Sequence, residues 1–179
     1  MGVEFTWVEG VPYADADVES GISNSDELNF AVSVDRPTFL RFANADRPVL
    51  FNTQWFVGYL PDYHHGFTVN GPVNVFFTFA MSTGYYQDRL IPQLLTVYEF
   101  ASRSGGVLPS VEYRFTDSLA ITAGVLYFFG RTELSDMAVQ EVSPVINRAG
   151  AHAYRQPVEN GFSSIRKRDE IFVKLRWTF

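Results

Sequence analysis

The chain has 179 residues, of which 46% are hydrophobic, 16% aromatic and 19% charged, with a formal net charge of −6 at pH 7. This length suits one domain with a sizeable core. The aromatic content excludes a disordered chain, and no run reaches the roughly 18 apolar residues that a membrane-spanning helix needs. The acidic balance argues against nucleic acid as a partner, and the absence of cysteine excludes disulfides and thiolate metal sites.

Apolar residues alternate with other residues along much of the chain, which predicts strands with two unlike faces. In chain order, the predicted strands cover residues 3–7, 38–42, 49–59, 72–83, 89–101, 107–116, 118–129 and 168–179. Several of them exceed the length of about 5–6 residues that is usual for strands in soluble proteins.

The predicted connections alternate in length. Tight polar turns are expected at 43–46, 86–89 and 115–118, and longer connections at 9–35, 61–71 and 130–167. The connection 102–106 is shorter, and we interpret its Gly105-Gly106 as a turn. Short turns at one end and longer loops at the other are typical of outer-membrane barrels.

The pattern therefore predicts one all-β domain over residues 1–179, an antiparallel up-and-down transmembrane β-barrel with eight strands in this chain. A soluble lipocalin-like barrel is the main alternative, because it would place the same apolar residues inside. Long strands, aromatic residues near strand ends and a last strand that stops on Phe179 favour lipid on the outside.

The end of the chain carries a resemblance. The alternating apolar residues of the last strand resemble the C-terminal assembly signal of bacterial outer-membrane β-barrel proteins: Ile171, Val173, Leu175, Trp177 and Phe179. The segment 113–119 is similar to the periplasmic turns of that family, and segments 36–42 and 125–130 resemble parts of long proteobacterial barrels of unassigned function.

This resemblance implies a protein of the Gram-negative outer membrane with periplasmic termini, in contact with outer-membrane lipid and lipopolysaccharide. It also implies that the last strand is recognised by the barrel assembly machinery. Because Met1-Gly2 leads directly into a strand, with no secretory signal, we expect a processed or truncated chain. A complete barrel and the C-terminal part of a larger one both remain open.

The residues expected to face the lumen sort by depth. We predict an ionic network near the periplasm, because charges inside a barrel need partners: Glu112, Arg114, Lys174 and Arg176. Toward the outside we predict a pocket for a small hydrophobic ligand, lined by Phe56, Phe76, Leu95, Leu126, Phe128 and Phe172. Ordinary packing inside a small barrel is the competing interpretation of the apolar set.

Other motifs predict no chemistry. Asp15, Asp17 and Glu19 offer oxygens to Ca²⁺ but lack the remaining spacing of an EF-hand, so we interpret 9–35 as a solvated acidic loop. His64-His65 has no third histidine nearby, since His152 lies in another loop. No metal, cofactor or catalytic set is therefore predicted, and we do not expect an enzyme.

The predicted function is porin-like transport, as a channel or uptake barrel for small hydrophobic molecules. The alternative is a structural or surface-interaction barrel that transports nothing and acts through extracellular loops 9–35 and 131–167. In the second loop, Arg155, Arg166, Lys167 and Arg168 are either lipopolysaccharide contacts or simply solvated.

Overall fold

The computed structural model describes residues 1–179 except 16, 68, 70, 131–161, 163–164 and 166. Its strands are β1 (Gly2–Ala14), β2 (Ile22–Thr38), β3 (Val49–Tyr59), β4 (Val73–Ser82), β5 (Leu90–Glu99), β6 (Ser104–Arg114), β7 (Leu119–Phe129) and β8 (Glu170–Trp177). They form one eight-stranded sheet in the order β1 to β8, and each strand is antiparallel to its neighbours. The all-β, up-and-down prediction is confirmed. No described residue belongs to a helix that could cross a bilayer.

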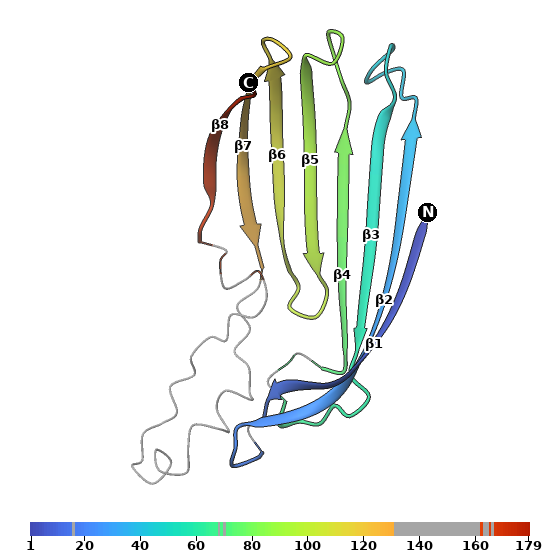
Figure 1. Ribbon diagram of the computed structural model, residues 1–179, viewed down its shortest axis with the longest axis vertical. Coiled ribbons are helices and arrows are strands. Elements are labelled where there is room, and N and C mark those ends of the chain that lie inside the picture. Colours follow the sequence, from blue (N-terminus) through green and yellow to red (C-terminus); the bar gives the residue numbers. More distant parts are fainter. Residues whose placement is uncertain (16, 68, 70, 131–161, 163–164, 166) are drawn as a thin grey trace.

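The sheet is a single curved layer, with β1 and β8 at its two edges (Figure 1). The turns β2–β3, β4–β5 and β6–β7 lie at the end where the chain terminates, and the β1–β2, β3–β4 and β5–β6 connections lie at the opposite end. Among the described residues, the buried hydrophobic side chains are only Val49, Leu60, Phe67 and Ala120. A sheet normally buries one face against a second layer, and the described part of this chain supplies none.

The sheet does not close into a barrel. Among the described residues, β1 and β8 share no ladder. The ladder partners can be followed from Gly2 on β1, strand by strand, to Phe128 on β7. Phe128 lies beyond the last pair of the β7–β8 ladder, which joins Leu126 to Glu170. The two edge strands are thus staggered along the strand direction, and both outer edges are open.

The prediction of a loop over residues 9–35 is wrong. β1 and β2 form a long hairpin whose ladder extends from Gly2–Ser33 to Ala14–Ile22, with a register shift between Val8 and Val11. Such an irregularity breaks the alternation of apolar residues. Because the hairpin is largely exposed, acidic side chains on it remain hydrated while the ladder satisfies the backbone.

Two further predictions are corrected. Residues 39–48 connect β2 to β3, so the strand predicted at 38–42 ends at Thr38; the amides of Ala43 and Asn44 donate to the Leu40 carbonyl in a turn. Gly105 and Gly106 lie inside β6 rather than in a turn. A Cβ on Gly105 would clash with the backbone carbonyl of Val97 on β5 and would lie 2.9 Å from Cζ of Phe129 on β7, so the glycine permits the close approach of both neighbouring strands.

Candidate functional site

The register gives the sheet one face that is predominantly apolar, called the apolar face below; on β2 this face also carries Arg36, opposite Phe51. Residues directly opposite one another in a ladder point to the same face, so the pairs can be followed from strand to strand. From β3 to β8 this face carries no charged residue. Its larger side chains include Phe51, Trp55, Phe77, Phe79, Leu94, Val111, Tyr113, Ile121, Tyr127, Ile171, Val173, Leu175 and Trp177.

Many of these side chains are exposed to solvent. Trp55 is 43% exposed, Tyr127 51% and Trp177 73%. Trp7 on β1 lies on the same face, so all three tryptophans of the chain point to one side of the sheet. The Trp55 ring packs on its ladder neighbour in β4, Phe77, at 4.5 Å between centroids. A continuous apolar surface of this kind marks contact with lipid or with another protein.

The opposite face, called the mixed face, holds every predicted lumen residue that lies in a strand. The register places the predicted ionic set and the predicted ligand set together on it. The roles predicted for these residues remain hypotheses. The face also carries Glu4, Asp35, Asn52, Gln93 and Thr122.

Three of the four predicted ionic residues are in contact. Nε of Arg114 donates to Oε1 of Glu112 at 2.6 Å, and Nη2 of Arg176 donates to the same oxygen at 3.2 Å. Arg176 reaches Glu112 across β7, where Ala120 lies between Arg114 and Arg176 and is only 3% exposed. The small side chain of Ala120 leaves room for this bridge. Lys174 lies opposite Thr122 and makes no ion pair with the described residues.

The residues of the predicted ligand set lie on strands β3 to β5, β7 and β8 of the mixed face. Phe56 and Phe76 face each other across β3 and β4. Phe128 lies over Gly106 and stacks on Phe162 at 6.4 Å. Phe172 lies so closely over Gly124 that a Cβ there would be 2.6 Å from its Cζ. The rings of Phe128 and Phe172 thus cover glycines of the neighbouring strand.

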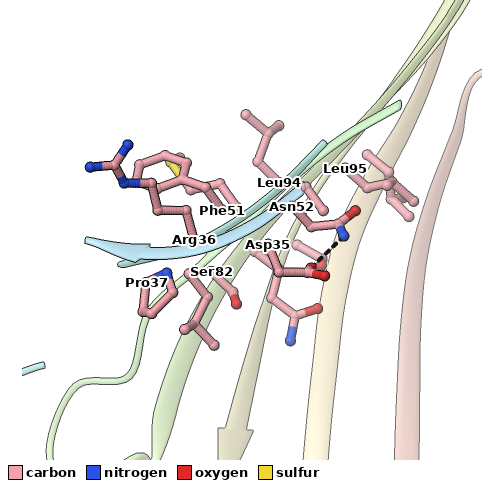
Figure 2. Close-up of a pocket in the computed structure, with 14 residues that line it drawn as sticks. Asp35, Arg36, Pro37, Phe51, Asn52, Ser82, Leu94 and Leu95 are labelled. Atoms are coloured by element: carbon pink, nitrogen blue, oxygen red, sulfur yellow. Dashed lines mark hydrogen bonds between the residues drawn. The ribbon is translucent and has the colours of Figure 1, made fainter. Parts of the chain in front are cut away.

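A groove of about 570 Å³ runs over β2 to β6 (Figure 2). On the mixed face its polar lining is Asp35, Asn52, Ser82, Gln93 and Ser110, and its apolar lining includes Leu50, Leu95 and Leu108. Nδ2 of Asn52 donates to Oδ1 of Asp35 at 2.6 Å, as drawn in Figure 2. Ser82, Gln93 and Ser110 are directly opposite one another in successive ladders. Leu95 is the one residue of the predicted ligand set that lines this groove.

A second polar cluster lies beyond the strands, where two segments predicted as separate polar loops meet. Nε2 of His64 is 2.9 Å from Oδ2 of Asp15, and Nδ1 of His64 donates to the carbonyl of Asp62 at 3.3 Å. The Ser23 hydroxyl donates to Asp15 and keeps the pKa of that carboxyl below its ordinary value. The hydrogen bond to Asp62, and then Asp15 itself, raise the pKa of His64.

The remaining predicted residues are placed as follows. The members of the predicted assembly signal that lie in β8 are on the apolar face at the open edge of the sheet, and Phe179 is fully exposed after the strand. Lys167 and Arg168 are exposed. Arg155, Arg166 and His152 lie outside the described residues. A comparison with models of known protein families found no match, and comparisons with curated proteins and with solved structures found none either.

Proposed function

We propose that this chain forms part of the wall of an outer-membrane β-barrel, with its apolar face against lipid. The observation that supports this proposal is the charge-free face from β3 to β8 in a sheet of one layer. In water, exposed apolar surface costs about 25 cal/mol per Å². An uncovered face of this width is therefore unfavourable in water. A hydrocarbon core about 30 Å thick would cover it.

The tryptophans test this proposal directly, because all three belong to the apolar face. In vesicles of phospholipid with brominated acyl chains, we expect strong quenching of tryptophan fluorescence. Single-tryptophan variants, with the other two changed to Phe, should report Trp55 as deeper than Trp177, since Trp55 lies in mid-strand and Trp177 at a strand end. Fluorescence unchanged by bromine would overturn the proposal.

We further propose that the barrel is wider than eight strands. Among the described residues, neither β1 nor β8 has a partner strand at its outer edge, yet inside hydrocarbon every backbone N–H and C=O needs a partner. Further strands would therefore join at β1 and β8. The chain has no native cysteine, so cysteine pairs at positions 3, 5 or 7 and 171, 173 or 175 can be tested for disulfide formation in membranes. A disulfide within one chain would overturn the wider barrel and indicate closure on eight strands.

The mixed face would then line a passage for small molecules. Polar and aliphatic side chains lie side by side in the groove over β2 to β6, which suits solutes that combine an apolar body with a few hydrogen-bonding groups. We propose uptake or passive transport of such solutes. Proteoliposomes should release amphipathic solutes, and Gln93→Leu should change the order of preference. Full membrane insertion without any flux would favour the surface-interaction alternative instead.

The orientation belongs to the same proposal. The tight turns lie at the end of the sheet where the chain terminates (Figure 1), and short turns face the periplasm in barrels of this class. The connection 60–72 would then face outward. Protease added to intact cells should cleave a site engineered into 60–72 and spare one engineered into 115–118. The reverse result would invert the orientation.

A further inference from the structure

The second polar cluster combines two chain segments that lie far apart in sequence. Asp15 directly follows β1, Asp17 lies in the turn of the β1–β2 hairpin, and His64 belongs to the connection between β3 and β4. One imidazole nitrogen and two carboxylate oxygens lie within 4.8 Å of one another. This donor set is not merely acidic, because a nitrogen ligand from a different segment is directed at the carboxylates.

The orientation of the His64 ring supports metal binding. Nδ1 lies 3.3 Å from the backbone carbonyl of Asp62, and a carbonyl only accepts, so Nδ1 carries the donating proton. Nε2 points to Asp15 at 2.9 Å. A histidine that binds a metal through one ring nitrogen almost always donates the other N–H to a carbonyl, carboxylate or water, which fixes the ring.

The Asp15 carboxylate is held in place without being exposed. Its side chain is fully buried, and it accepts hydrogen bonds from the Ser23 hydroxyl and from the backbone amide of Asp17 at 2.9 Å. The hydrogen bond from Asp17 brings its backbone next to Asp15, so both carboxylates come from the same end of the β1–β2 hairpin. Rigid placement lowers the cost of assembling ligands around a cation.

The connection 60–72 packs closely against this turn. A Cβ on Gly66 would clash with Oδ1 of Asp15 and would lie 2.6 Å from Oδ2 of Asp17, so a larger residue there would displace these carboxylates. Phe67 is 1% exposed and forms a β-bridge with Asp15. Its ring packs on Tyr13 at 5.6 Å and on His64 at 4.2 Å. One side of the cluster is therefore closed by apolar contacts.

Charge balance also favours a cation. Two carboxylates face a single imidazole, so even a protonated His64 leaves a net negative charge, and one of the two carboxylates is buried. Burying a charge is costly unless it is paired or binds a metal. Imidazole is a ligand suited to Zn²⁺ and related transition metals, whereas Ca²⁺ takes oxygen ligands alone.

We propose that Asp15, Asp17 and His64 bind one divalent cation of the Zn²⁺ class and that this cation ties the β1–β2 hairpin to the connection 60–72. Solvent would complete the coordination, because the cluster supplies three protein ligands. The site does not depend on the proposed membrane function, since all three ligands lie outside the ladders that carry the apolar face.

The test is calorimetric titration of the full chain with Zn²⁺, using Ca²⁺ as the competing ion. We expect one saturable Zn²⁺ site with affinity well above that for Ca²⁺. His64→Gln and Asp17→Asn should each weaken binding by at least about tenfold. His65→Gln is the matched control, because His65 is the adjacent histidine and packs on Tyr63 instead of joining the cluster; its binding should equal that of the unmodified chain.

Several results would overturn the site. They are no saturable Zn²⁺ heat, tighter binding of Ca²⁺ than of Zn²⁺, or equal losses in His64→Gln and His65→Gln. Asp17→Asn should fold normally, because Asp17 is exposed and the variant keeps the backbone amide that donates to Asp15. Unchanged affinity in that variant would also contradict the three-ligand set. Circular dichroism of each variant confirms that the β structure is intact before titration.

Discussion

On the mixed face, single glycines determine where aromatic rings can lie. Gly124 of β7 is directly opposite Phe172 of β8, and Gly106 of β6 is opposite Phe128 of β7. In each pair the ring covers the glycine of the neighbouring strand. Aromatic residues across from strand glycines restore packing that glycine alone cannot provide. These phenylalanines therefore have a structural role in the sheet, whatever else they contact.

We predict that Gly124→Ala destabilises the protein by about 1–3 kcal/mol, the usual cost of forcing a side chain into filled space. The added Cβ would lie 2.6 Å from Cζ of Phe172 and 2.9 Å from Cβ of Ser110, so the ring has to move. Guanidinium unfolding in lipid vesicles measures the change in the free energy of unfolding. Gly58→Ala is the control, because the nearest atom to its Cβ would be Oδ1 of the flexible Asn29 side chain, at 3.3 Å, and the others lie at ordinary van der Waals distance. Equal losses in the two variants would contradict this account.

The face of most strand residues and the grouping of Glu112 with Arg114 and Arg176 were predictable from the sequence, but other contacts between distant segments were not. The alternation places Glu112, Arg114 and Arg176 on one face, and the structure brings them together. The Asp15–His64 contact joins residues 49 positions apart, through a hairpin whose register shift hides its period. The groove escaped detection for a related reason. Ser82, Gln93 and Ser110 become neighbours only once three strands are in register.

At the scale of the strands, the Glu112 cluster links β6 to β8 across β7. Glu112 is the shared acceptor of two guanidinium groups, and its own side chain is only 14% exposed. Arg114 and Arg176 are 44% and 51% exposed, so water screens their charges. Removing the shared acceptor leaves two like charges close together, whereas removing one arginine leaves one pair intact.

We predict that Glu112→Gln lowers the free energy of unfolding by about 1–2 kcal/mol, between the values for exposed and buried ion pairs. Arg176→Gln should cost less. Lys174→Gln is the control, because Lys174 lies on the same face of β8 without an ion pair to the described residues. The losses should shrink in 1 M salt, which screens charges beyond about 3 Å. Similar losses for Glu112→Gln and Lys174→Gln would show that the cluster contributes nothing specific.

The strands differ in how well their own residues define them. Residues 49–59 were predicted with the bounds that β3 has, because apolar residues recur at alternate positions from Val49 to Tyr59, with Thr53 as the exception. β2 was predicted as an acidic loop followed by a short strand, although Leu28, Phe30, Val32 and Val34 recur at alternate positions; the acidic residues around this segment outweighed its alternation in the prediction. Its strand structure depends on ladders to β1 and β3, which are contacts between distant residues. Whether β1 and β8 pair with each other or with further strands likewise depends on contacts between distant residues, which local periodicity does not predict.

For the molecule as a whole, the decisive property is which face meets hydrocarbon. Phe77 and Thr78 are neighbours in mid-β4 and point to opposite faces: Phe77 to the apolar face, where it packs on Trp55, and Thr78 to the mixed face between Gln54 and Val97. They share strand, depth and backbone environment. Charges introduced at these two positions therefore differ mainly in their surroundings, which are hydrocarbon at Phe77 and the lumen at Thr78 if the proposal holds.

We predict that Phe77→Arg lowers stability in phospholipid vesicles by about 2–4 kcal/mol, the cost of an arginine near the bilayer midplane on the lipid side of a barrel, in addition to the loss of the ring. Phe77→Ala measures that loss separately, because it removes the contact with Trp55 without adding a charge. Thr78→Arg should be tolerated to within about 1 kcal/mol, since lumen positions accept charge. Denaturant titration of the folded fraction gives all three values. If Phe77→Arg costs no more than Phe77→Ala, or if Thr78→Arg is the more disruptive arginine, the apolar face does not lie in hydrocarbon and the protein is not a membrane barrel of the proposed kind.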